Sequence, residues 1–300
     1  MKTIKFLPPL AIIFAAILWS VDGYIRQNLY NVSSFLIVLL EHLLGAIIFL
    51  PLLIKGWKEV TKLRDRSWVS VIWVALFGGL LGTYFYTKAL SYVEYIDLSV
   101  VVLLQKFQPL FAIALAAVIL KEKLTKRYLL CAAGAVIGGL FVTFGSIFPN
   151  FETNSKMIIA SLLSLLAAFA WGSSTVLGKH ALKHLSFFTL TSLRLWITTI
   201  VALAIFCTMK NRPDIFALTG NQWMFIIIIV LSTGSVALFI YYYGLKYIPA
   251  THATIYELFW PFSAVLIDWF IRGRILTTSQ LFGGLLLIVS SILLPRKSSD

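Results

Sequence analysis

The chain has 300 residues, of which 60% are hydrophobic and 12% are charged, and its formal net charge is +13. With a mean hydropathy of +0.92, it has too little polar surface to cover a soluble globule, so these values predict a protein solvated by lipid. A membrane-spanning helix needs about 20 mostly apolar residues, which leaves room for roughly ten such helices and excludes a soluble catalytic domain.

Ten apolar runs follow one another along the chain, with ends good to a few residues. In chain order they lie at about 7–26, 33–54, 67–88, 97–120, 127–147, 157–178, 186–209, 222–246, 250–271 and 277–295. Each run is long enough to cross a bilayer as a helix. The sequence therefore predicts an all-α integral membrane protein with ten transmembrane helices.

The basic residues gather in alternate links between these runs. Links on the side of the N-terminus, such as 55–66 and 121–127, hold more than twice as many Lys and Arg as those on the other side. The positive-inside rule then predicts a multi-pass protein of the cell (inner) membrane with cytoplasmic N- and C-termini. Almost all of this bias comes from the first half of the chain. Because the charge lies in links, we expect the lipid bilayer as partner and no nucleic acid.

An offset of 152 residues superposes several uncommon residues without a gap. The pairs are Trp19 with Trp171, Gly82 with Gly234, Tyr95 with Tyr247, Pro109 with Pro261, and Leu124-Thr125 with Leu276-Thr277. We interpret this as a duplication that gives two five-helix repeats, 1–148 and 149–300. The first run belongs to the repeat, so we expect it to be retained and not cleaved as a signal sequence.

Five spans per repeat have a consequence for topology. Because five is odd, equivalent halves in tandem enter the membrane in opposite orientations, which makes an inverted repeat. Many secondary transporters are built in this way, with the solute site near the membrane midplane between the halves. The chain has no G-x-x-x-x-G-K-[ST] motif, so we expect any energy source to be a gradient of an ion or solute.

Several motifs occur in the order of a known transporter superfamily. They are Leu18-Trp19-Ser20, Ala170-Trp171-Gly172, Arg194, the mid-helix Pro109 and Pro261, Lys121-Glu122-Lys123-Leu124-Thr125, and the glycines Gly134, Gly138, Gly139, Gly283 and Gly284. On these residues the whole chain resembles the drug/metabolite transporter superfamily, specifically the group with two EamA-type repeats. The resemblance implies ten helices around a central cavity lined by spans one, three, four, six, eight and nine. It does not choose among amino acids, drugs, amines and sugar derivatives.

Two positions depart from the pattern of that superfamily. Glu41-His42 stands where an Arg is expected in the second span of the first half, and His42 is the counterpart of Arg194 at the 152-residue offset. Arg274 replaces an acidic residue after the ninth span. These departures leave the roles of the second spans open.

Glu257 is the candidate for coupling because ionisable groups inside a bilayer mark transport paths. It lies one turn before Pro261, and its counterpart Gln105 lies one turn before Pro109. Proline bends a helix and frees a carbonyl group, which favours a local polar site. Glu257 would then bind a cation or accept a proton; the alternative is a structural salt bridge, for example with Lys106.

Three further polar residues lie within spans. His42 would be a proton relay helped by Glu41, since histidine titrates near neutral pH, or it would form an interhelical hydrogen bond. Arg194 would clamp the solute or brace a carboxylate or carbonyl group. Asp22 and Asp268 lie near span ends, and we expect them to be solvated or capping.

Aromatic residues complete the predicted site. Trp19 and Trp171 would line the cavity and stack on an organic solute or hold an ammonium group, or else anchor their helices at the membrane interface. Tyrosines of spans three, eight and nine add rings and hydroxyl groups. The predicted solute-binding residues are Trp19, Tyr84, Gln105, Lys106, Trp171, Tyr241, Tyr256 and Glu257, and the predicted polar network is Glu41, His42, Arg194 and Glu257.

The function predicted from these features is secondary active transport by alternating access. We expect export of a small organic solute, such as an amino acid, metabolite or drug-like compound, with protons as the candidate coupling ion. An importer of a choline-like amine is one alternative. A lipid-modifying membrane enzyme is another, but it would need clustered His, Asp or Glu, and the four histidines are scattered. We predict no metal and no cofactor, and leave monomer and homodimer open.

Overall fold

The computed structural model describes residues 6–92, 104–105, 107–144, 155–272 and 277–294, and every regular element in these ranges is helical. The first half contains α1 (Leu7–Gln27), α2 (Ser34–Val60), α3 (Asp65–Trp73), the π-helix η1 (Val74–Leu81), α4 (Gly82–Leu90), α6 (Gln108–Leu115), the π-helix η3 (Ala116–Leu120) and α7 (Lys126–Phe144). The second half contains α8 (Ser155–Ala181), α9 (Phe187–Thr208), α10 (Gly220–Leu231), α11 (Ser235–Tyr247), α12 (Ala250–Tyr256), α13 (Phe259–Arg272) and α14 (Thr278–Leu293). The predicted all-α class is confirmed.

Within the described residues, seven helical stretches are long and apolar enough to cross a membrane. They are Leu7–Gln27, Ser34–Val60, Asp65–Leu90, Lys126–Thr143, Ile158–Ala181, Phe187–Thr208 and Gly220–Tyr247, and Gln108–Leu120 and Thr278–Leu293 are shorter apolar helices. The ninth apolar run forms two helices, α12 and α13, that meet at Glu257 and Leu258. The count of ten spans stays a prediction, because part of the fourth run lies outside the described residues.

Large apolar side chains are exposed on the outside of the helices, while the interior holds polar side chains as well as apolar ones. Val118, Leu130 and Ile292 are 76%, 74% and 73% exposed. In contrast, α9 buries Ser192 and Thr198 completely. Large exposed apolar patches mark a surface that contacts lipid or a partner protein. The exposed apolar side chains therefore suit a bilayer, and the buried polar side chains are shielded from it.

The third apolar run of each half loses regular α-helical geometry at matching places. In the first half this is η1, which ends just before Gly82; in the second half α10 ends at Leu231 and α11 begins at Ser235. The amide of Gly234 donates to the carbonyl of Ile229 at 2.7 Å, a five-residue spacing characteristic of a π-turn. Since Gly82 and Gly234 are equivalent at the 152-residue offset, the break belongs to the repeat.

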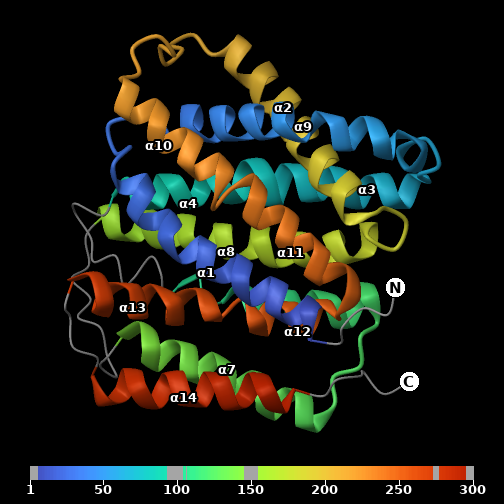
Figure 1. Ribbon diagram of the computed structural model, residues 1–300, viewed down its shortest axis with the longest axis vertical. Helices are drawn as coiled ribbons and strands as arrows, with labels where there is room; N and C mark the ends of the chain where they lie inside the picture. Colours follow the sequence, from blue (N-terminus) through green and yellow to red (C-terminus); the bar gives the residue numbers. More distant parts are fainter. Residues whose placement is uncertain (1–5, 93–103, 106, 145–154, 273–276, 295–300) are drawn as a thin grey trace.

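The two halves pack against each other reciprocally (Figure 1). Helix α1 of the first half packs along α11 of the second, and α8 of the second half packs along α4 and η1 of the first. Helix α2 pairs with α9, and α7 pairs with α14, so equivalent helices meet one another. Figure 1 shows α1 and α8 running in opposite directions. An inverted repeat predicts this arrangement, which puts the first helices of both halves at the centre.

Capping residues in the sequence account for several helix starts. Thr219 forms a capping box with Gln222 at the start of α10, and Thr277 forms one with Gln280 at the start of α14. The side chain of Ser186 accepts the Thr189 amide at the start of α9. Each cap satisfies an amide that would otherwise lack a partner at the helix end. These local signals thus fix the residue at which each of these helices begins.

Candidate functional site

A cavity lies between the two halves, and its wall is built from helices of both. The volume of the cavity is about 170 Å³. Eight of the predicted site residues line it, namely Trp19, Glu41, His42, Gln105, Trp171, Arg194, Tyr241 and Glu257. The fold thus brings together residues that are far apart in the sequence, from the first, second, fourth, sixth, seventh, eighth and ninth apolar runs.

Two predicted tyrosines are not among the residues that line the cavity. Tyr84 packs edge-on against Phe35, with ring centroids 6.5 Å apart, in an apolar cluster. Tyr256 packs against the apolar core. Lys106 lies outside the described residues, as does the side chain of Asp268.

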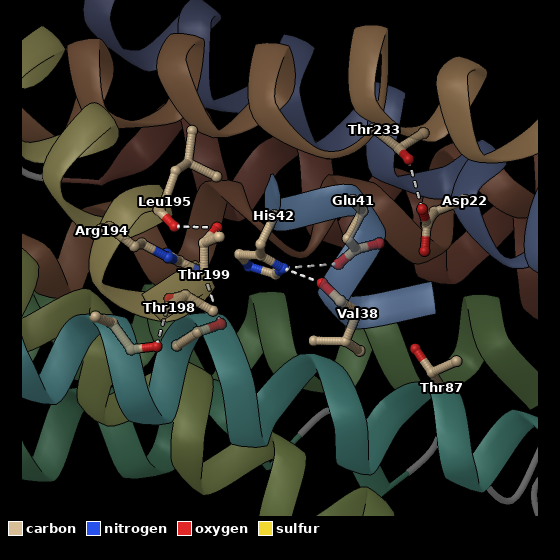
Figure 2. A network of polar contacts seen from close by, with 12 residues as sticks. Asp22, Val38, Glu41, His42, Thr87, Arg194, Leu195, Thr198, Thr199 and Thr233 are labelled. Carbon is tan, nitrogen blue, oxygen red and sulfur yellow. Dashed lines mark hydrogen bonds and ion pairs between the residues drawn. The ribbon is translucent and has the colours of Figure 1, made fainter. Parts of the chain in front are cut away.

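Arg26 forms the centre of an ionic cluster at one end of the cavity. Its Nε donates to Asp22 Oδ2 at 2.5 Å, and its Nη2 donates to Glu41 Oε2 at 2.7 Å. Its Nη1 donates to the Thr87 hydroxyl at 3.2 Å. Asp22 Oδ1 accepts the Thr233 hydroxyl from the other half at 2.5 Å, as Figure 2 shows. Asp22, Arg26 and Glu41 are all buried, so the cluster compensates its own charges away from water.

One expectation from the sequence is wrong at this cluster. Asp22 is not solvated or capping, since it pairs with Arg26 in the interior. Arg26 itself lies in the last turn of α1 and is buried. The four-residue spacing between the two was the available signal, since residues at i and i+4 share one face of a helix.

Glu41 and His42 both line the cavity, but they have different partners. Glu41 makes the contact between helices, through Arg26. The Nδ1 of His42 lies 2.8 Å from the carbonyl of Val38 on its own helix and 3.4 Å from Glu41 Oε1 (Figure 2). The expected interhelical hydrogen bond of this pair is therefore made by Glu41, while His42 is turned back toward its own backbone.

Arg194 holds the irregular third span of the opposite half. Its Nη2 donates to the carbonyl of Gly78 in η1 at 2.6 Å, and its Nη1 donates to the Tyr242 hydroxyl at 2.9 Å. The indole of Trp171 donates to the same Gly78 carbonyl at 3.2 Å. A π-helix exposes carbonyl groups that a regular helix would use internally, and here two side chains of the second half occupy one of them. This geometry is that of an internal brace to a carbonyl group.

Glu257 accepts two hydrogen bonds at the break between α12 and α13. The Tyr241 hydroxyl donates to Oε1 at 2.6 Å, and Gln108 Nε2 donates to Oε2 at 2.5 Å. Thr175 Oγ1 lies 2.8 Å from the Tyr241 oxygen; because that tyrosine gives its one proton to Glu257, Thr175 donates to it. Glu257 thus joins both halves through neutral donors. The alternative partner, Lys106, lies outside the described residues.

Aromatic rings form much of the cavity wall. The rings of Trp19 and Tyr241 lie with centroids 5.2 Å apart, and those of Tyr86 and Trp171 with centroids 5.3 Å apart. The indole of Trp260 donates to the carbonyl of Trp19 at 2.9 Å. Ring pairs at these separations make favourable contacts. Both repeat-related tryptophans therefore face the cavity, which is the first of the two roles considered for them.

Gln108 and Trp260 line the cavity and were missed in the sequence. Each directly precedes a mid-helix proline, and the two are equivalent at the 152-residue offset. The proline positions could therefore have predicted these two residues, but the predicted site included only the residues one turn before each proline, Gln105 and Glu257. Among the described residues, no group of three His, Cys, Asp or Glu side chains could hold a metal ion.

Comparisons with known proteins agree with this architecture. The model of the EamA-like transporter family matches residues 7–144 and again residues 158–295. The chain is 40% identical over 285 residues to the riboflavin transporter ImpX of Fusobacterium nucleatum, covering 94% of this chain and 95% of that protein. It is 23% identical over 284 residues to the uncharacterized transporter YoaV of Bacillus subtilis, covering 93% of each.

A solved crystal structure has the same fold, with a TM-score of 0.74 at 16% identity, and covers 95% of both chains. The family model spans most of both halves, and the relatives are transporters. The protein is therefore a multi-pass membrane transporter for a small molecule and not an enzyme. The chain belongs to the EamA-like transporter family.

Proposed function

We propose that this transporter carries riboflavin, or a neutral solute with the same planar heteroaromatic ring and polyol chain. The observation that carries the proposal is the 40% identity, over 94% of the chain, to a protein named as a riboflavin transporter. Identity of this extent spans both halves, and so includes every helix that contributes to the cavity.

The wall of the cavity suits a flat, uncharged ring system. Trp19, Trp171, Tyr86 and Tyr241 present aromatic surface, and stacking of a planar heterocycle on such rings stabilises binding by about 1–3 kcal/mol per ring in other proteins. Hydroxyl groups such as that of Ser174 also line the cavity. They offer the donors and acceptors that a polyol chain needs.

The charges in the cavity favour a neutral solute over a zwitterion. Arg26 is already paired with Asp22 and Glu41, and Glu257 already accepts from Tyr241 and Gln108. A charged solute that paired with Arg26 would have to separate a buried ion pair, which is unfavourable, and one that paired with Glu257 would have to compete with the two neutral donors that this carboxylate already has. Export of amino acids and import of an amine are thus less well supported than flavin transport.

Alternating access follows from the reciprocal packing of the halves. Each half presents its first helix to the third span of the other, so exchanging the two packing arrangements would open the cavity to the opposite side. We infer that Glu257 is the proton acceptor of this cycle, because it lies at the junction of both halves. Efflux is the expected direction, and the protein is placed in the cell (inner) membrane with both termini in the cytoplasm.

Proteoliposomes test the proposal directly. Full-length protein is reconstituted, and entry and exit of riboflavin, followed by its fluorescence, are measured with a pH gradient of either polarity. We expect saturable riboflavin flux that unlabelled amino acids and choline do not compete for. Trp171→Ala should lower this flux, whereas Trp57→Ala, at a tryptophan that is 55% exposed, should not. Flux of an amino acid or choline without riboflavin flux would overturn the substrate assignment.

A further inference from the structure

The side-chain amide of Gln105, at the cavity wall, has no hydrogen-bond partner among the described residues. Gln105 is 3% exposed, and neither its Nε2 nor its Oε1 has a partner among the described residues. Buried amide groups are almost always hydrogen-bonded in proteins, because an unmet donor or acceptor destabilises the fold. Gln105 lines the cavity, so a solute bound there is in reach of it.

The neighbours of Gln105 are engaged with one another, which leaves it apart from the internal network. Gln108, one turn further along the same span, donates to Glu257. Glu257, the repeat counterpart of Gln105, has a donor on each carboxylate oxygen. The equivalent positions of the two halves have therefore diverged: Glu257 is hydrogen-bonded within the protein, and Gln105 lies at the cavity wall with no hydrogen-bond partner among the described residues.

A glutamine amide presents one acceptor and one donor side by side in a plane. Its complement is an adjacent donor and acceptor in another planar group, and the same pairing lets Gln and Asn read the edge of adenine in two hydrogen bonds. Riboflavin carries such an edge in its pyrimidine ring, where the N3–H group lies between two carbonyl groups.

We propose that Gln105 reads this imide edge, with Oε1 accepting the N3–H proton and Nε2 donating to the neighbouring ring carbonyl. The inference rests on the proposed function and names the part of the solute that the cavity selects. It also explains why an amide is buried without a partner, since the solute supplies both hydrogen bonds. Gln105 is thus a specificity-determining residue for a planar imide or amide solute.

A binding cycle with two ligands and two proteins tests the assignment. Binding of riboflavin and of N3-methylriboflavin to purified full-length protein is measured by quenching of flavin fluorescence, for the wild type and for Gln105→Leu. The wild type should bind riboflavin about 10- to 100-fold more tightly than the methylated analogue, as a two-bond contact to a base edge discriminates elsewhere. Gln105→Leu should bind the two flavins equally, because leucine has no amide group to hydrogen-bond with the N3–H and carbonyl groups of riboflavin.

Gln27→Leu is the matched control, since Gln27 is exposed and outside the cavity, and it should keep the wild-type preference. Thermal unfolding of Gln105→Leu checks that the variant is folded, and removing an unmet amide should leave its stability unchanged or higher. Equal binding of both flavins by the wild type, or a preference that survives in Gln105→Leu, would overturn the inference and leave the proposed function standing. Absence of binding of either flavin by the wild type would overturn both.

Discussion

Buried charges in this protein are compensated residue by residue. Arg26 contacts Asp22, Glu41 and Thr87, and through Asp22 it reaches Thr233 of the other half. Removing one member of a buried ionic group leaves an uncompensated charge, whereas removing all of them often leaves the stability almost unchanged. The effect therefore depends on whether a charged residue is removed alone or together with its partners.

Arg26→Leu should lower the free energy of unfolding by roughly 3 kcal/mol, because two buried carboxylates then lack a cation. The triple variant Arg26→Leu, Asp22→Asn, Glu41→Gln should recover most of that loss. Thermal unfolding in detergent, followed by tryptophan fluorescence, measures both. Equal stability of the single and triple variants would contradict the charge-compensation argument.

Glu257→Gln should reduce riboflavin flux driven by a pH gradient to the rate seen without the gradient, because glutamine cannot accept a proton. Exchange of riboflavin across a membrane without a gradient should continue, since Tyr241 still has an acceptor. Asp65→Asn is the control, at an exposed carboxylate on α3, and should keep the response to the gradient. A full response in Glu257→Gln would remove this residue from coupling.

At the scale of the helices, glycine positions determine how closely the equivalent helices α7 and α14 approach each other. A Cβ atom on Gly138 of α7 would lie 2.7 Å from the Gly283 carbonyl oxygen and 2.8 Å from the Leu287 nitrogen, both on the backbone of α14. The backbones touch here, as at other small-residue helix interfaces in membranes. On Gly139, the next residue, a Cβ would lie 3.7 Å from a Leu258 side-chain carbon, which is an ordinary contact.

Gly138→Val should separate α7 from α14 and destabilise the protein by about 1–3 kcal/mol, as overpacking of an interface does. Gly139→Ala should change the stability little, because its methyl group has room. Unfolding temperature and the yield of monodisperse protein in detergent compare the two. A larger effect for Gly139→Ala than for Gly138→Val would show that this seam is not where the backbones meet.

The whole molecule has a basic edge and an edge with fewer basic residues. Lys55 lies toward the C-terminal end of α2, Lys62 follows that helix, and Lys246 lies in the last turn of α11. Figure 1 shows these two helix ends on the side where α1 begins and α14 ends. On that edge Lys246 also donates to the carbonyl of Leu185 at 2.7 Å, which ties α11 to the link between α8 and α9. We expect this edge to face the cytoplasm, because translocation of positive charge is disfavoured.

Cysteine labelling tests the orientation. Asn31 and Lys62 are exposed and lie beyond opposite ends of α2. In a background with Cys207→Ser, which removes the exposed native thiol, a membrane-impermeant thiol reagent should label Asn31→Cys in right-side-out vesicles and Lys62→Cys in inside-out vesicles. The opposite pattern would reverse the proposed topology without affecting the fold.

Composition and spacing alone predicted the helical membrane class, the repeat and the two cavity tryptophans. These predictions need only one-dimensional patterns: apolar runs give spans, and an offset of 152 residues pairs Trp19 with Trp171. The same pairing drew attention to Gln105 and Glu257, which both line the cavity. Tyr84 and Tyr256 do not line the cavity, and residue type alone could not predict this, because it does not say which face of a helix borders a cavity.

Only the tertiary structure decided which buried polar groups form hydrogen bonds within the protein and which have no partner. The bond from Thr233 to Asp22 joins residues 211 positions apart, and no local pattern encodes a contact of that range. The same holds for Gln105: its sequence position marks it as polar and near a proline, but its lack of a partner appears only once every neighbour is placed. The sequence determines which polar side chains lie within the membrane spans, and the packing of the helices determines which of them have no hydrogen-bond partner within the protein.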